Sequence, residues 1–320
     1  MGRKSRKNEN IFTIISVFLI VLIVVSSLLT IYLYIKDKEE LKSFKSVDKT
    51  YNEKAKILEE QKEILDIKTE ELNSINEEIE SYKDINKKIE ETKKEFFTKA
   101  KELEDKVLAG TTDKKIAYLT FDDGPYNSTY KFFEVLEKYK VQATFFTTST
   151  NGQYCYDNKK MDCTTLYKEY IKRGHTIANH TYTHAIWKGL YSSADSFITA
   201  VTNQDATIKE YADGYVTNIV RFPGGSVTSG KLKQAIIDKL KENGYGWVDW
   251  SANDGDGGDL DSKEDAWSNF TSTIDDNIEV VLLHDYNYIT LSILPDIIEY
   301  LQQKDYVLLP LFYESSVINK

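Results

Sequence analysis

The 320-residue sequence predicts an α/β domain, either a barrel or a doubly wound sheet, preceded by a transmembrane helix and a long helical stalk. Three observations support this organisation. Residues 11–35 carry no charge, a Glu- and Lys-rich segment without proline or glycine follows, and short apolar runs alternate with amphipathic stretches from about residue 109. Such alternation is typical of repeated β-α units, whose right-handed crossovers close into a barrel or a doubly wound sheet.

The uncharged segment 11–35 has the length of a membrane span. A helix of this length covers roughly 37 Å at ~1.5 Å per residue, which exceeds the ~30 Å hydrocarbon core. Four Lys and Arg residues lie within the first seven positions and favour a cytoplasmic tail, residues 1–10. We predict an uncleaved single-pass anchor in the cell membrane, with the remaining chain outside the cell. Cleavage near Ser26 and Ser27 is the alternative.

Residues 36–108 are predicted to form a helical stalk. A heptad register places apolar side chains along one seam, with Leu58, Leu65, Leu72, Ile79, Ala100 and Val107 at a and Ile75, Tyr82, Ile89, Phe96 and Leu103 at d. Asn86 and Lys93 are polar a positions that can fix register and strand number. The pattern favours a coiled coil and hence a homo-oligomer. A solvated single helix or a partly disordered tether is the alternative, because Gln61 and Lys68 weaken the first heptads.

Charge and cysteine content narrow the possible partners. The net charge is −10, and no basic patch interleaved with aromatic residues occurs, which argues against nucleic acid. Cys155 and Cys163 are the only cysteines, separated by a short polar loop. Disulfides persist outside the cell, so we predict a mutual disulfide, with two free thiols as the alternative.

The globular domain is predicted to cover residues 109–320, because Ala109 and Gly110 break the helical pattern. Predicted strands are 116–121, 143–147, 176–178, 219–222, 246–250, 280–283 and 307–311. Helical periodicity fits residues 129–139, 166–173, 193–211, 231–243, 265–273 and 291–303.

Polar residues follow these predicted strands at their carboxyl ends: Asp122 and Asp123, His180, Arg221, Asp249 and His284. Strand ends converge on one face of a (β/α) barrel, and active sites are built there. We therefore expect these side chains to share one site.

His180 and His184 form a His-x-x-x-His pair, and Asp122-Asp123 supplies neighbouring carboxylates. Imidazole and carboxylate are ligands of Zn²⁺ and similar divalent ions, so the sequence predicts a metallohydrolase. A helical turn would point both imidazoles the same way. The alternatives are an incidental surface pair of histidines and a solvated Asp-Asp turn.

Five short motifs occur in order: Thr-Phe-Asp122-Asp123-Gly-Pro, His180-Thr-Tyr-Thr-His184, Arg221-Phe-Pro223-Gly224-Gly225, Asp249-Trp250-Ser and Leu282-Leu-His284-Asp285. Together they resemble the polysaccharide deacetylases with NodB homology, carbohydrate esterase family 4. The resemblance covers roughly residues 114–313. It implies a distorted (β/α) barrel and metal-dependent removal of acetyl groups from polysaccharides.

By this resemblance Asp123, His180 and His184 bind a divalent metal, with Zn²⁺ favoured and Co²⁺ or another ion as the alternative. Asp122 is the general base that takes a proton from the attacking water. Arg221 holds that carboxylate ionised and oriented. A salt bridge at the barrel rim is the alternative for Arg221.

The resemblance also implies which residues contact the oxyanion, protonate the leaving amine and bind the acetyl methyl group. The backbone N–H of Gly224 would donate to the oxyanion. Many members carry a tyrosine there, in Arg-Pro-Pro-Tyr, so this chain lacks the contacts of that ring. His284 would be the general acid, hydrogen-bonded by Asp249. Trp250 and Leu282 would line a pocket for the acetyl methyl group, with ordinary core packing as the alternative.

Two further features are assigned no catalytic part. His175 precedes a predicted strand and is interpreted as structural. The run from Asn253 to Asp259 resembles a calcium loop but lacks the downstream glutamate of an EF-hand. We interpret it as a mobile acidic rim near the site, with calcium binding as the alternative.

The sequence thus predicts a membrane-anchored hydrolase of linear amides, which removes N-acetyl groups from a cell-wall glycan. N-acetylglucosamine residues of peptidoglycan are the favoured substrate. Chitin oligomers, poly-N-acetylglucosamine and acetyl xylan are alternatives, as is a catalytically inactive wall-binding module. Phosphohydrolase chemistry at His284-Asp285 is not favoured, because folds built around that dyad are helical and His284 ends an apolar strand.

Overall fold

The computed structural model describes the backbone of residues 3–149 and 163–320, and the side chains of residues 16–149 and 165–320. The chain forms two compact units, Met1–Ile89 and Glu90–Lys320. The predicted disulfide between Cys155 and Cys163 lies outside the described side chains.

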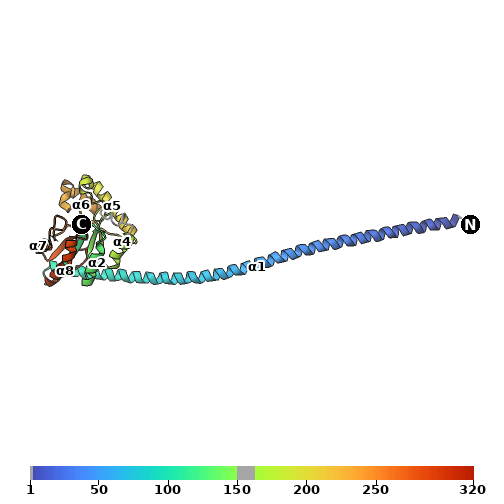
Figure 1. The fold of residues 1–320 in the computed structure, drawn as a ribbon, viewed down its shortest axis with the longest axis horizontal. Helices are drawn as coiled ribbons and strands as arrows, with labels where there is room; N and C mark the ends of the chain where they lie inside the picture. The colour runs from blue at the N-terminus through green and yellow to red at the C-terminus, as the bar shows by residue number, and fades with distance from the viewer. Residues whose placement is uncertain (1–2, 150–162) are drawn as a thin grey trace. The chain divides into compact units, whose positions relative to one another are not determined.

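Helix α1 (Arg3–Leu108) runs without a break through the predicted span and stalk, coloured blue to cyan in Figure 1. No proline or glycine interrupts residues 36–106. Lys–Glu pairs one turn apart, such as Lys49–Glu53 and Lys56–Glu60, add weak support along its surface. The prediction that the stalk is helical is confirmed. By length and composition alone, the first part of α1 could cross a membrane.

The second unit is built on one parallel sheet. Its strands are β1 (Lys115–Asp122), β2 (Thr144–Thr147), β3 (Thr176–Asn179), β4 (Ile219–Val220), β5 (Gly246–Trp247), β6 (Ala252–Asn253), β7 (Ile278–His284) and β8 (Tyr306–Leu308). They follow the order β5-β4-β3-β2-β1-β7-β6, and β8 also pairs with β1. The parallel α/β fold is confirmed. In the described part of the chain the sheet is an open half-barrel that ends at the short strands β5 and β6.

Helices connect successive strands, as expected for β-α units. They are α2 (Thr129–Tyr139), α4 (Cys163–Lys172), α5 (Ala194–Tyr211), α6 (Lys233–Glu242), α7 (Lys263–Thr273) and α8 (Tyr288–Gln303), with 3₁₀ turns η1 (Ile186–Lys188), η2 (Leu190–Ser192) and η3 (Ser226–Leu232). Ser193 and Ser262 cap α5 and α7 by accepting backbone N–H groups. The 3₁₀ turns and β6 are too short to leave a periodic pattern in the sequence.

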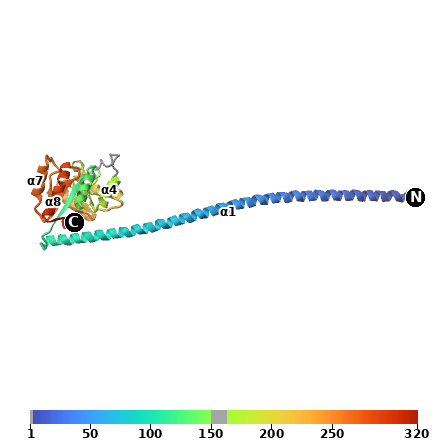
Figure 2. The same ribbon diagram turned by 60° about the horizontal axis from the view of Figure 1, so that its bottom comes forward.

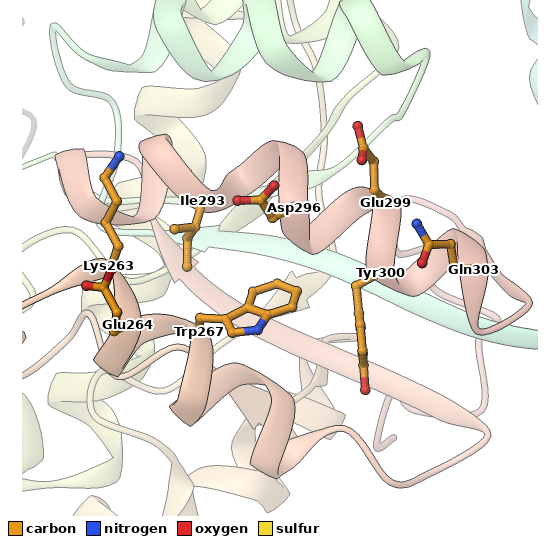
Figure 3. Close-up of a pocket in the computed structure, with 8 residues that line it drawn as sticks. All are labelled: Lys263, Glu264, Trp267, Ile293, Asp296, Glu299, Tyr300 and Gln303. Carbon is orange, nitrogen blue, oxygen red and sulfur yellow. The ribbon is translucent and has the colours of Figure 1, made fainter.

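Helices α7 and α8 lie side by side in both ribbon views (Figures 1 and 2). Residues of both helices line a surface hollow of about 460 Å³. Figure 3 shows the indole of Trp267 at its centre, with Lys263 and Glu264 of α7 on one side and Tyr300 of α8 on the other. The hollow contains no histidine, so it lacks the ligand set that the sequence predicts for a metal.

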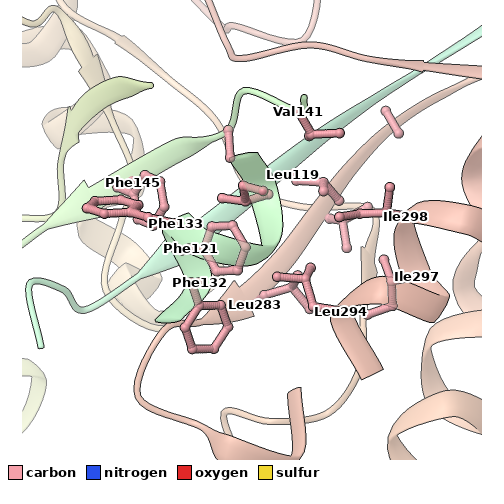
Figure 4. Packing of buried hydrophobic residues seen from close by; sticks show 14 of the residues in the cluster. Leu119, Phe121, Phe132, Phe133, Val141, Phe145, Leu283, Leu294, Ile297 and Ile298 are labelled. Atoms are coloured by element: carbon pink, nitrogen blue, oxygen red, sulfur yellow. The ribbon is translucent and has the colours of Figure 1, made fainter. Parts of the chain in front are cut away.

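The central strand β1 divides the core in two, because alternate residues of a strand face opposite sides. Leu119 and Phe121 pack outward against α2 and α8, in the cluster of Figure 4. Phe121 stacks on Phe145 of β2 with ring centroids 4.9 Å apart. Each such buried side chain stabilises the fold by roughly 1.5–3 kcal/mol. Ile116 and Tyr118 point to the other, inner face.

The last turns of α1 cover this inner face. Ala100 and Val107 are buried there, and Leu103 packs against the same cluster. These three residues were expected to extend the coiled-coil seam, and that expectation is wrong. An apolar stripe packs against whichever apolar surface covers it, and here the domain's own strands do so.

One buried carboxylate fixes this contact. Glu104 of α1 accepts hydrogen bonds from Tyr118 Oη (3.0 Å), Ser315 Oγ (2.6 Å) and the Ser316 backbone N–H (2.9 Å). Glu104 is fully buried. Burial, and after it the charge of Glu104, raises the pKa of the Tyr118 hydroxyl, which therefore remains a donor.

Replacing Glu104 by alanine is expected to lower the free energy of unfolding by about 3 kcal/mol, because it leaves buried donors without an acceptor. Urea unfolding of a chain that begins at Glu90 measures this. The matched control is Glu102→Ala, two residues earlier in α1 and exposed to solvent, which should change stability by less than about 0.5 kcal/mol. Equal effects of the two substitutions would contradict the role of Glu104.

Candidate active site

A cavity of about 430 Å³ opens where the strands of the second unit end. Its lining comprises Asp122, Asp123, His180, His184, Ile186, Gly224, Trp250, Asn253, Gly255, Asp256, Gly257, Gly258, Leu282, His284 and Tyr286. The parallel register places Asp122 of β1 directly beside His284 of β7. Of the residues predicted for the site, all but Arg221 and Asp249 line the cavity. Arg221 lies beneath it, fully buried.

The three predicted metal ligands, Asp123, His180 and His184, have their ligand atoms close together. His184 Nε2 lies 3.3 Å from Asp123 Oδ1, and His180 Nε2 lies 3.5 Å from the same oxygen. Ligand atoms on a tetrahedral ion with bonds of ~2.0–2.1 Å are about 3.3–3.4 Å apart. Asp123 Oδ1 is buried and accepts no hydrogen bond among the described residues. A buried carboxylate oxygen without a donor fits a cation, so this residue set suits a divalent metal.

A bend in the backbone brings the two imidazoles together. The helical turn that was considered for residues 180–184 does not form. The Thr181 N–H donates to Asn179 Oδ1 (2.8 Å), and Thr181 and His184 take φ of 66° and 43°. Residues 180–184 therefore leave the helical path, yet the two rings lie with centroids 4.9 Å apart. Asp123 also has positive φ, 71°. Such conformations are costly outside glycine and gather at functional sites.

The tautomer of His180 is set by the neighbouring strand. His180 Nδ1 lies 2.9 Å from the carbonyl oxygen of Arg221 and donates to it, which leaves the lone pair of Nε2 directed at Asp123. Burial lowers the pKa of His180 to about 3. A neutral imidazole is the form that binds a metal.

Arg221 hydrogen-bonds Asp122 and orients its carboxylate, as predicted. Arg221 Nη1 donates to Asp122 Oδ1 (2.9 Å) and to Thr120 Oγ1 (2.7 Å), and its guanidinium lies 4.1 Å from the ring centroid of Phe146. Burial raises the pKa of Asp122, and the charge of Arg221 opposes that rise. The second carboxylate oxygen, Oδ2, lies 3.5 Å from His180 Nε2. One oxygen is thus fixed, and the other faces the cavity.

His284 has a different partner from the one predicted. His284 Nδ1 and its backbone N–H both bond the carboxylate of Asp256, at 2.7 Å each. Asp249 instead accepts the backbone N–H of Ser226 (2.9 Å) and its hydroxyl. The predicted Asp249–His284 bond is therefore wrong, because the turn that starts η3 occupies Asp249. The interpretation of the Asn253–Asp259 run as an acidic rim is wrong for Asp254 and Asp256, which are buried, whereas Asp259 is exposed.

The partner determines the charge of His284. Burial by itself would lower the pKa of His284, but the hydrogen bond and charge of Asp256, with smaller contributions from Asp122 and Asp123, raise it to about 9. At neutral pH the imidazole is protonated and can donate through Nε2. Sequence reasoning missed Asp256, which lies in an acidic run between β6 and α7 and carries no local signal that separates it from Asp249.

Apolar and glycine residues line the cavity beside its carboxylates and imidazoles. Gly224 has φ of 71°, and a Cβ there would come within 3.1 Å of Ile186 Cδ1 and Thr228 Oγ1, so the position favours glycine. Trp250 and Leu282 both line the cavity, as predicted. Tyr286 was not predicted; its ring centroid lies 5.2 Å from that of His284.

His175 lies away from the cavity. Its Nδ1 accepts the Ala143 backbone N–H (3.1 Å), and its ring stacks on Phe133. Burial lowers its pKa to about 3, so it remains neutral within the core. These contacts agree with the structural part expected for it.

Family and sequence comparisons relate the chain to polysaccharide deacetylases. The family model described as polysaccharide deacetylase matches residues 109–245. A peptidoglycan-N-acetylglucosamine deacetylase of Bacillus cereus is 27% identical over 199 residues, covering 61% of this chain and 68% of the relative. A putative polysaccharide deacetylase of Bacillus subtilis, YheN, is 29% identical over 197 residues, or 60% and 65% of the two chains.

Solved structures show the same fold. The catalytic domain of peptidoglycan N-acetylglucosamine deacetylase from Eubacterium rectale superposes with a TM-score of 0.57 at 32% identity, covering 64% of this chain and 91% of that one. A polysaccharide deacetylase from Bacillus cereus gives a TM-score of 0.55 at 25% identity, with 63% and 94% covered.

Replacing Asp256 by asparagine is expected to lower the pKa of His284 from about 9, because only the smaller contributions of Asp122 and Asp123 then oppose burial. NMR titration of the imidazole in protein without added metal measures this. The control is Asp249→Asn, which should leave the His284 titration in place. A larger shift with Asp249→Asn than with Asp256→Asn would restore the pairing that the sequence suggested.

Proposed function

Because the chain belongs to the polysaccharide deacetylase family, carbohydrate esterase family 4, we propose that it removes N-acetyl groups from an extracellular amino-sugar polymer. Members of this family are hydrolases. N-acetylglucosamine of peptidoglycan is the proposed substrate, in keeping with the names of the relatives in Bacillus cereus and Eubacterium rectale. The observation that carries the proposal is the single cavity shared by Asp122, His284 and the Asp123–His180–His184 group.

Asp123, His180 and His184 would hold a divalent cation. Two imidazoles and one carboxylate favour Zn²⁺, and Co²⁺ or another divalent ion also suits these ligands. When bound, such an ion polarises a carbonyl oxygen and makes a neighbouring water more acidic.

The protein's own groups then divide the work of amide hydrolysis. Asp122 accepts a proton from the attacking water through Oδ2, while Arg221 keeps Oδ1 in place. The N–H of Gly224 stabilises the oxyanion that forms on the carbonyl oxygen. His284 gives its Nε2 proton to the amine as the C–N bond breaks, because an amine leaves poorly as an anion. The products are acetate and a free amino group on the sugar.

The remaining contacts select and orient the acetyl group. Trp250 and Leu282 form the apolar part of the wall and suit the acetyl methyl group. Asp256 keeps Nε2 of His284 directed into the cavity by binding Nδ1. Asp249 anchors the turn after Gly225 through Ser226 and so supports the backbone that presents Gly224.

The N-terminal helix would place this chemistry at the cell wall. In the proposed arrangement residues 11–35 cross the cell membrane, residues 1–10 remain in the cytoplasm and the stalk carries the catalytic domain outside. Apolar residues of the stalk before Glu90, among them Leu58, Leu65, Leu72 and Ile75, are exposed along α1. Pairing of these residues with a second copy would give a homo-oligomeric coiled coil.

Acetate release tests the function. The full-length chain, purified in detergent, should release acetate from N-acetylated peptidoglycan, and Asp122→Asn should lower kcat about 10²- to 10⁴-fold through loss of the general base. The control is Asp113→Asn, the same change at an exposed position before β1, which should keep wild-type activity.

Two outcomes would contradict the proposal in different ways. Equal acetate release by Asp122→Asn and the wild type would contradict the assigned base. Release from chitin oligomers, poly-N-acetylglucosamine or acetyl xylan, with none from peptidoglycan, would contradict the substrate and leave the reaction in place.

A further inference from the structure

Two acidic side chains lie behind His284, in the loop between β6 and α7. Asp254 and Asp256 are 0% and 3% exposed. Asp256 uses Oδ1 for His284 Nδ1, and Oδ2 for the His284 backbone N–H. Asp254 Oδ1 accepts the backbone N–H of Asp256 (3.1 Å). The mechanism above uses Asp256 and gives no part to Asp254.

A single hydroxyl joins the two carboxyl groups. Thr290 Oγ1 of α8 lies 2.7 Å from Asp254 Oδ2 and 2.8 Å from Asp256 Oδ2. A threonine hydroxyl has one hydrogen and can donate to only one of these oxygens. The other short O···O contact is stable only if a proton lies on a carboxyl group. The geometry therefore requires one protonated acid in this cluster.

The surrounding donors indicate which acid carries that proton. Asp256 receives two N–H groups of His284, and these favour its ionised form. Asp254 receives one backbone N–H and, among the described residues, forms no ion pair. Burial, and after it the charge of Asp256, raises the pKa of Asp254 to about 8. The groups that face it from α7 and α8, Asn269 and Thr290, are uncharged.

The loop that carries the two acids packs closely against its neighbours. Asn269 Nδ2 donates to the Asp254 carbonyl oxygen (3.2 Å), and a Cβ at Gly255 would lie 2.5 Å from the same nitrogen. A Cβ at Gly257 would lie 3.0 Å from His284 Cε1. The backbone of the loop is therefore held against α7 on one side and against the His284 imidazole on the other.

We propose that Asp254 is a positioning residue that is protonated at neutral pH: its carboxyl group donates to Thr290 Oγ1, and Thr290 donates to Asp256 Oδ2. Asp256 thereby gains a third donor and is held in the orientation that directs His284 into the cavity. The proposal rests on the proposed function in one respect, the use of His284 as the acid.

Infrared difference spectroscopy of the full-length chain at neutral pH tests the protonation without any assay of activity. The wild-type minus Asp254→Asn spectrum should contain the carbonyl stretch of a protonated carboxylic acid. The wild-type minus Asp256→Asn spectrum serves as the comparison and should contain carboxylate bands. Carboxylate bands alone in the Asp254→Asn difference would overturn the proposal.

Kinetics of acetate release test the positioning. Asp254→Ala and Thr290→Val should each lower kcat about tenfold with KM unchanged, the scale of one buried hydrogen bond lost. Asp254→Asn should recover most of this loss, because its amide can donate to Thr290 as the acid does. An unchanged kcat in Asp254→Ala, or no recovery by Asp254→Asn, would contradict the proposal. If the wild type releases no acetate, the proposed function fails, and the infrared result still decides the protonation of Asp254.

Discussion

The buried ion pair between Arg221 and Asp122 is the interaction on which the rest of the site depends. It joins the end of β4 to the end of β1, and the same arginine reaches Thr120 and the carbonyl oxygens of Val248 and Asp249. A buried guanidinium is tolerated only when paired and hydrogen-bonded, so the strand ends must close around it. That closure also places the Arg221 carbonyl oxygen against His180 and so fixes a ligand. Arg221 thus positions Asp122 through its side chain and His180 through its backbone carbonyl oxygen.

Other side chains on the same face of β1 support this ion pair. Tyr118, Thr120 and Asp122 are alternate residues and face the same inner side of the sheet. Asp122 and Thr120 bind Arg221, and Tyr118 binds Glu104 from the last turns of α1. The end of the stalk helix is therefore part of the core beneath the catalytic cavity. Tyr118, Thr120 and Asp122 each have a hydrogen-bond partner, as the members of a buried polar network must have for the network to be stable.

Much of this could be predicted from residues alone, because it depends on local patterns. The strands have strong apolar runs, α2 begins and ends where its periodicity does, and polar residues at strand ends must meet once the strands are parallel. The predictions that were wrong concern contacts between segments that are distant in the sequence. Nothing local distinguishes Asp249 from Asp256 as the partner of His284. The bend at Thr181 depends on the Asn179 side chain, which donates to the Val201 carbonyl oxygen and to Asp205 of α5. The end of the heptad register is covered by the domain itself.

The central claim is that Asp123, His180 and His184 gather around one divalent cation, and anomalous diffraction from crystals grown with Co²⁺ tests it most directly. A second acidic group among the described residues, Asp275, Asp276 and Glu279, provides an internal comparison. There Glu279 already accepts the backbone N–H groups of Asp275 and Asp276. The account predicts one strong cobalt peak within bonding distance of Asp123 Oδ1, His180 Nε2 and His184 Nε2, and none at the second group. A cobalt peak elsewhere, with those three side chains apart, would contradict it.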